Sequence, residues 1–186
     1  MAFGTRPVDD GTIRTARLHL RPLLFADAPA LFEAVDSSRR TLERWLPWAA
    51  AVDSPDSLNL FIDRTLRENH EGCAHRAILE PDGRIAGHIS LERRTETAGE
   101  FGYWIRSDRE NRGYATEAAR ALLHHAFRHL GVHRVAAYTD VDNIASSRVL
   151  ARVGFTREGI VRHRVRAPGG WRDHILHGLL DGELRP

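Results

Sequence analysis

Residues 109–117 read Arg-Glu-Asn-Arg-Gly-Tyr-Ala-Thr-Glu, and they separate an aromatic segment (100–105) from a long amphipathic one. In that segment, 115–130, apolar residues recur at steps of three and four, which predicts a helix that Gly131 ends. A helix N-terminus has unpaired N–H groups and a positive dipole end, and Gly113 lets an anion approach the backbone closely. This strand-to-helix junction is therefore typical of a phosphate or pyrophosphate site.

Two arginines of the junction, Arg109 and Arg112, are expected to add positive charge to this site. Neither common nucleotide fingerprint is present. The chain has no Gly-x-Gly-x-x-Gly after its first predicted strand and no Gly-Lys-Ser/Thr loop. The phosphates are therefore expected to belong to something other than a Rossmann or P-loop nucleotide.

On both sides of the junction, stretches with strand and helix patterns alternate. Strands are predicted at 15–23, 74–80, 84–93, 100–105, 134–139, 155–165 and 171–180. Helices are predicted after the N-cap residue Asp27, from Ser54-Pro55-Asp56 to Gly72, at 115–130 and after Asn143. This order predicts an α/β fold with a central mixed sheet and helices on its faces. Without a linker or repeat, residues 12–182 are expected to form one domain after a flexible N-terminus (1–11).

The composition excludes several classes of protein. The 27 basic residues, all Arg, nearly balance 25 acidic ones, so a nucleic-acid partner is not expected. Cys73 is the only cysteine, which excludes an internal disulfide and a multi-thiolate zinc site, and no metal is expected. No apolar run is long enough for a membrane span, and Met1–Asp10 lacks a signal core, so a cytoplasmic protein is expected.

Four segments together resemble the GNAT superfamily of N-acetyltransferases, and within it the RimJ/RimL-like branch that acetylates the N-termini of ribosomal proteins. The resemblance spans nearly the whole chain, from about residue 12 to about residue 180. The segments are Arg17-Leu18-His19-Leu20-Arg21-Pro22, Glu100-Phe101-Gly102-Tyr103-Trp104, Arg112-Gly113-Tyr114-Ala115-Thr116-Glu117-Ala118, and Asn143-Ile144-Ala145-Ser146 with Gly154-Phe155.

The resemblance implies a mostly antiparallel sheet and acetyl-CoA as the acetyl donor. It also implies that backbone N–H groups before the long helix cradle the pyrophosphate. Those groups belong to Asn111, Arg112, Gly113, Tyr114, Ala115 and Thr116. Glu110 stands where the family usually has Gln or Arg, and it should point outward because a carboxylate repels a pyrophosphate. Asn143 is expected to cap its helix and to contact the pantetheine arm, and Ser146 to lie near the thioester sulfur.

An amine must lose a proton before it attacks a thioester, so the site needs a base. Glu100 is the candidate, and the alternative is a solvent-facing strand carboxylate. The N–H groups near Trp104 and Ile105 would stabilise the charge on the carbonyl oxygen. Ser146 is the first candidate to protonate the leaving thiolate, with Tyr138 second. Some RimL-like relatives have an acid where this chain has Val165, so no base is expected there.

The acceptor is expected between the N-terminal helices and the last hairpin. Trp45 and Trp48, three residues apart on one helical face, are candidates for its lining, and so is Trp171; the alternative is that they belong to the core. The acceptor can be a protein N-terminal amine or a small-molecule amine such as an antibiotic or polyamine. A GNAT fold that binds acyl-CoA without efficient catalysis is a further alternative, and the sequence leaves a homodimer open.

Overall fold

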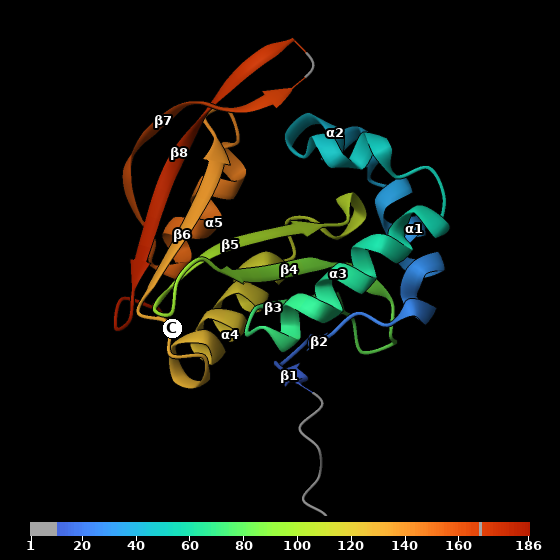
Figure 1. Cartoon of the computed structure of the whole chain (residues 1–186), viewed down its shortest axis with the longest axis horizontal. Coiled ribbons are helices and arrows are strands. Elements are labelled where there is room, and N and C mark those ends of the chain that lie inside the picture. Colours follow the sequence, from blue (N-terminus) through green and yellow to red (C-terminus); the bar gives the residue numbers. More distant parts are fainter. Residues whose placement is uncertain (1–10, 168) are drawn as a thin grey trace, which may run out of the picture.

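The computed structural model describes residues 11–167 and 169–186. Most of the expected flexible N-terminus and Pro168 of the last predicted turn lie outside the described residues. The predicted fold class is confirmed: one eight-stranded, mostly antiparallel sheet carries helices on both faces (Figure 1).

Across the sheet, the strands follow the order of the chain except for the last two. The order is β1 (Ile13–Arg14), β2 (His19–Arg21), β3 (Ala74–Leu79), β4 (Ile85–Arg93), β5 (Ala98–Ile105), β6 (Arg134–Asp140), β8 (Gly170–Leu180) and β7 (Thr156–Ala167). Only β5 and β6 run parallel among the described neighbours. Of the strand predicted at 15–23, only His19–Arg21 (β2) is a strand, because Thr15 and Leu18 close a turn that follows β1.

The helices form one layer on each face of the sheet (Figure 1). The helices α1 (Ala28–Asp36), α2 (Arg39–Trp45) and α3 (Asn59–His70) lie on one side, and α4 (Tyr114–His129) and α5 (Ile144–Val153) on the other. Each layer buries its own apolar cluster against the sheet, with Trp104 in the first and Phe101 in the second. Asp27 is the N-cap residue of α1 as predicted, but its side chain does not cap that helix. Its carboxylate instead accepts from the Leu24 N–H and pairs with Arg21 at 2.7 Å.

The two parallel strands pair over only four residues each, Ala98–Phe101 of β5 with Arg134–Ala137 of β6. Beyond them β6 turns away from β5 (Figure 1), and we call this divergence, residues 102–105 and 138–140, the fork. The Arg106 N–H bonds to Ala86 of β4, and groups along a strand alternate, so the N–H groups of Tyr103 and Ile105 face the fork. The fork therefore lies beside two backbone donors of β5 that are beyond the end of its ladder with β6.

A buried histidine makes the fold sensitive to acid. His88 of β4 packs against Phe61 and His75, and burial, with the nearby charges of His75, Arg64 and Arg76, lowers its pKa to about 3. An unfolded histidine binds its proton near pH 6.5, so the stabilisation is complete above that pH. It is lost as the pH falls toward 3, at roughly 1 kcal/mol of unfolding free energy per pH unit.

His88→Gln is expected to flatten this dependence, because glutamine does not titrate. The measurement is urea unfolding at pH 7, 6 and 5, comparing slopes rather than absolute stabilities. His124→Gln, at an exposed position of α4, is the control and should keep the wild-type slope. A His88→Gln slope equal to that of the wild type would contradict the assignment.

Candidate functional site

The loop before α4 presents backbone donors to the solvent. We call residues 110–116 the phosphate loop. Asn111 and Gly113 have positive φ, 60° and 81°, and no side chain caps the helix that begins after Gly113. The N–H groups of Tyr114, Ala115 and Thr116 therefore have no intrahelical acceptor. A Cβ placed on Gly113 would meet only the Arg17 guanidinium, at 3.3 Å, so the front of the loop is open. This geometry fits a pyrophosphate.

An ion pair beside the loop braces it. The Glu117 carboxylate accepts from the Thr15 hydroxyl (2.6 Å) and from the Arg17 N–H and Nε (2.9 and 2.8 Å). Arg17 Nη1 in turn donates to the Arg112 carbonyl at 3.0 Å. Burial opposes ionisation of Glu117, but the bonds from Thr15 and Arg17 prevail and lower its pKa. Arg17 and Glu117 lie in the segments that carry the family resemblance, but the ion pair between them was not predicted.

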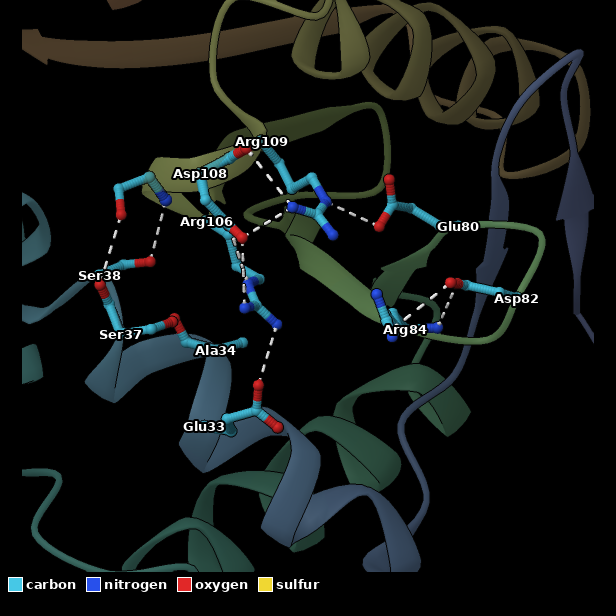
Figure 2. Close-up of polar contacts among 11 residues, drawn as sticks. Glu33, Ala34, Ser37, Ser38, Glu80, Asp82, Arg84, Arg106, Asp108 and Arg109 are labelled. Atoms are coloured by element: carbon cyan, nitrogen blue, oxygen red, sulfur yellow. Dashed lines mark hydrogen bonds and ion pairs between the residues drawn. The ribbon is translucent and has the colours of Figure 1, made fainter.

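Arg109 does not face the phosphate loop, contrary to the expectation (Figure 2). Its Nε donates to Glu80 at 2.8 Å and its Nη1 to Asp108 at 2.7 Å. The second Glu80 oxygen accepts from the Tyr114 hydroxyl at 3.0 Å. Arg109 therefore links the loop to the β3–β4 turn through Glu80. The carboxylates of Glu80 and Asp108 neutralise its charge. Arg112 is exposed and has no side-chain partner among the described residues, so its charge remains available.

An open cavity of about 1060 Å³ adjoins the phosphate loop along α4. Gly113 and Thr116 form one end, and Arg120, Arg152 and Arg185 are among its lining residues. The guanidinium groups give it a basic wall, which suits further phosphate groups. The Glu110 side chain is exposed, but its charge acts on Tyr103 at the fork, and partial burial raises its own pKa.

Tyr103 and Ser146 meet at the fork. Their hydroxyl oxygens lie 3.0 Å apart, and the Asn143 side chain accepts from the Ser146 N–H at 3.0 Å, as expected for a helix cap. Burial raises the pKa of Tyr103 to about 12; the nearby Glu110 charge adds to this, and the Ser146 hydrogen bond opposes it. Tyr103 therefore keeps its proton at neutral pH and can donate it. No role was predicted for Tyr103 from the sequence, although it lies within the aromatic motif.

Glu100 lies at the base of the fork, paired with Ala136, and two arginines occupy its oxygens. Arg164 donates to one at 2.8 Å, and Arg94 to the other at 3.1 and 3.2 Å. Arg164 also lies over the ring of Tyr138, 3.4 Å from its centroid. Arg164, the residue before Val165 in the hairpin, thus places a guanidinium rather than a carboxylate beside Glu100.

The tryptophans do not form one wall. The expected shared face of Trp45 and Trp48 is wrong, because α2 ends at Trp45 and Pro47 starts a separate 3-10 helix, Pro47–Ala51. Trp48 packs against Trp104, with ring centroids 6.3 Å apart, and both line a cavity of about 580 Å³ between α1 and α3. Trp45 lies beside the guanidinium of Arg172 instead, 5.9 Å away.

Trp171 and Trp104, which were also predicted as site residues, have surroundings other than those expected. Trp171 is 57% exposed on the last hairpin and stacks on His163, with ring centroids 6.1 Å apart. The Trp104 N–H points toward β4, because its strand neighbours Tyr103 and Ile105 face the fork. The backbone donors of β5 at the fork are therefore those of Tyr103 and Ile105.

The described residues contain neither a metal-binding cluster nor a membrane-spanning helix. Residues 11–167 and 169–186 contain no group of three or more His, Cys, Asp or Glu side chains that could hold a metal ion. None of the described helices is both long enough and apolar enough to cross a membrane.

Comparison with known proteins identifies the family. Residues 17–156 match the model of the acetyltransferase (GNAT) domain. The chain is 28% identical over 172 residues to the N-acetyltransferase YnaD of Bacillus subtilis, covering 92% of this chain and 98% of the relative. It is 27% identical over 191 residues to the ribosomal protein uS5-alanine N-acetyltransferase of Escherichia coli, covering 99% and 98%.

Solved structures agree. RimJ of Mycobacterium smegmatis, in complex with CoA-disulfide, superposes with a TM-score of 0.83 at 28% identity, covering 95% of this chain and 88% of that one. The fold also matches RimL, an L7/L12 α-N-protein acetyltransferase in complex with coenzyme A, with a TM-score of 0.86 at 24% identity, covering 91% and 97%. The chain belongs to the GNAT acetyltransferase family, with RimJ/RimL proteins among its relatives, and it is an N-acetyltransferase that uses acetyl-CoA.

Proposed function

We propose that this enzyme acetylates the α-amine of a protein N-terminus by direct attack in a ternary complex. The observation that carries the proposal is the fork, because the Tyr103–Ser146 pair lies at this opening of the sheet and Glu100 lies at its base. The E. coli relative is named for the N-terminal alanine of a ribosomal protein, which supports this acceptor and a cytoplasmic location.

In this proposal, the phosphate loop holds the pyrophosphate through the N–H groups of residues 111–116, and Arg112 adds charge. Asn143 contacts the pantetheine arm, and the N–H groups of Tyr103 and Ile105 face the thioester carbonyl. Acetyl-CoA supplies an acyl group that is already activated as a thioester. The residues of the chain therefore mainly position it and move protons.

The proton steps follow from the placement of three side chains. Glu100, directly or through a water, takes one proton from the amine as the N–C bond forms, and Arg164 must shift from that oxygen meanwhile. Ser146 gives a proton to the sulfur as the C–S bond breaks. The Tyr103 hydroxyl, 3.0 Å away, then restores the serine proton. Glu100 then releases its proton to solvent and Tyr103 regains one, so the proton lost by the amine equals the proton gained by the thiol and the enzyme returns to its starting state.

A small-molecule amine is the second candidate acceptor, and one observation favours it. The cavity of about 580 Å³ beneath Trp48 and Trp104 has the size of a ligand pocket and is mostly apolar. An amine with a planar apolar body would fit there.

The deciding experiment follows thiol release from acetyl-CoA with peptides that begin with Ala, Ser or Met, and with aromatic amines and polyamines. We expect release with at least one peptide and a mass gain of one acetyl group at its α-amine. Release with small amines alone would support the second candidate. Binding of acetyl-CoA without release across the panel would contradict both proposed acceptors.

A further inference from the structure

One guanidinium joins three segments around the acceptor side of the fork. Arg172 of β8 donates from Nε to Asp140 at 2.7 Å, and its Nη2 lies 3.4 Å from Asp142. Its Nη1 reaches the carbonyl of Arg44 at 3.5 Å, and its guanidinium lies beside the ring of Trp45. It therefore contacts the β6–α5 loop and the end of α2 at the same time.

Asp140, which pairs with Arg172, extends these contacts to the loop that leads into α5. Asp140 ends β6, and its side chain is only 4% exposed. Its carboxylate accepts from the Asp142 N–H and its carbonyl from the Asn143 N–H, both at 2.9 Å. Asn143 caps α5 through the Ser146 N–H. Arg172 is thus connected through Asp140 to the segment that carries Asn143 and Ser146.

The other end of α2 is also tied to a cofactor segment. The Ser107 N–H, in the turn that leads into the phosphate loop, donates to the Ser38 hydroxyl at 2.9 Å. The Ser107 hydroxyl lies 3.4 Å from the Ser37 carbonyl. Figure 2 shows Ser37 and Ser38 beside the turn of Arg106, Asp108 and Arg109. Helix α2 is therefore held at its start by the phosphate-loop side and at its end by Arg172.

We infer that Arg172 is a positioning residue that couples the binding of the two substrates. Coenzyme A binding orders the β6–α5 loop, and Arg172 transmits this order to α2 and Trp45, between the N-terminal helices and the last hairpin. This inference rests on the proposed function, because it needs an acceptor bound between those elements. Two ligands that stabilise the same arrangement bind cooperatively, typically by a factor of five or more. A guanidinium suits this role because its planar fork can bond several partners in fixed directions.

The test measures the affinity of the best acceptor peptide from the panel with and without saturating coenzyme A. In the wild type, coenzyme A should tighten peptide binding roughly fivefold or more. Arg172→Gln should remove this factor and raise the KM for the peptide by a similar amount, with kcat and acetyl-CoA affinity nearly unchanged. Asp140→Asn should lose the same coupling, and Arg172→Lys should restore part of it.

Arg166→Gln is the matched control, since Arg166 is an exposed arginine of the same hairpin with no ion pair among the described residues. Full coupling in Arg172→Gln, or an equal loss in Arg166→Gln, would overturn the inference. These outcomes differ from failure of the proposed function, which would appear as a wild-type enzyme that releases no thiol with any peptide.

Discussion

Gly113→Val is expected to lower the affinity for acetyl-CoA by roughly a hundredfold or more, about 3 kcal/mol. Gly113 has a φ of 81°, which a β-branched residue adopts only with strain of about 1–3 kcal/mol. Relief of that strain would rotate the peptide groups that aim their N–H donors at the pyrophosphate. The added side chain would also stand where the anion approaches. Calorimetry with coenzyme A, together with a thermal melt, measures both effects.

Gly131→Val is the control for strain alone. Gly131 follows the opposite end of α4, has a φ of 67°, and has nothing within 4 Å of an added Cβ. We expect a similar loss of stability there and nearly normal binding of coenzyme A. Wild-type affinity in a folded Gly113→Val variant would mean that the phosphate loop is not the pyrophosphate site.

Glu100→Gln is expected to reduce kcat roughly a hundredfold at neutral pH, because general-base catalysis typically contributes this much or more. Glutamine keeps the shape and can still accept from Arg164, but it cannot take the proton of the amine. The affinity for acetyl-CoA should hold, because Glu100 lies on the face of the sheet opposite the Tyr103–Ser146 pair. Steady-state kinetics between about pH 6 and pH 9 give the comparison.

A second variant distinguishes a catalytic role of Glu100 from a purely structural one. Glu100 bonds to Arg164 at 2.8 Å, so Arg164→Gln removes the same ion pair and leaves the carboxylate in place. If Glu100 only anchors the hairpin, both variants should lose activity equally. If it is the base, Glu100→Gln should be much the slower of the two. Unchanged turnover in Glu100→Gln across this pH range would exclude Glu100 as the base.

Periodic patterns within single segments accounted for most of the fold. The apolar spacing from 115 to 130 predicted α4, which spans Tyr114–His129, and Asn143 was correctly placed as the cap of α5. Gly113 at the junction was also predicted, because a helix start that needs positive φ is a local property of the chain. These features depend on neighbours within a few residues, and such neighbours can be read from the sequence.

Side-chain partners that are distant in the chain could not be predicted in this way. Arg109 was expected beside the phosphates, but Glu80, 29 positions earlier, pairs with it. Glu100 was expected to be a free base or a solvent-facing carboxylate, but Arg164, 64 positions later, bonds to it. The directions of Trp45 and Trp48 depended on where α2 ends. Each of these outcomes follows from the tertiary packing of strands and helices, which periodicity does not encode.

The short parallel ladder between β5 and β6 also bears on protein synthesis. Strands β1 to β5 come from the first 105 residues, whereas β6 to β8 come from residues 134–180. On the ribosome, the first group of antiparallel strands emerges and can pair before the second group has been translated. The fork needs one strand from each group. A nascent chain therefore has no complete fork until β6 (Arg134–Asp140) has left the exit tunnel, and acetylation by this enzyme cannot start before then.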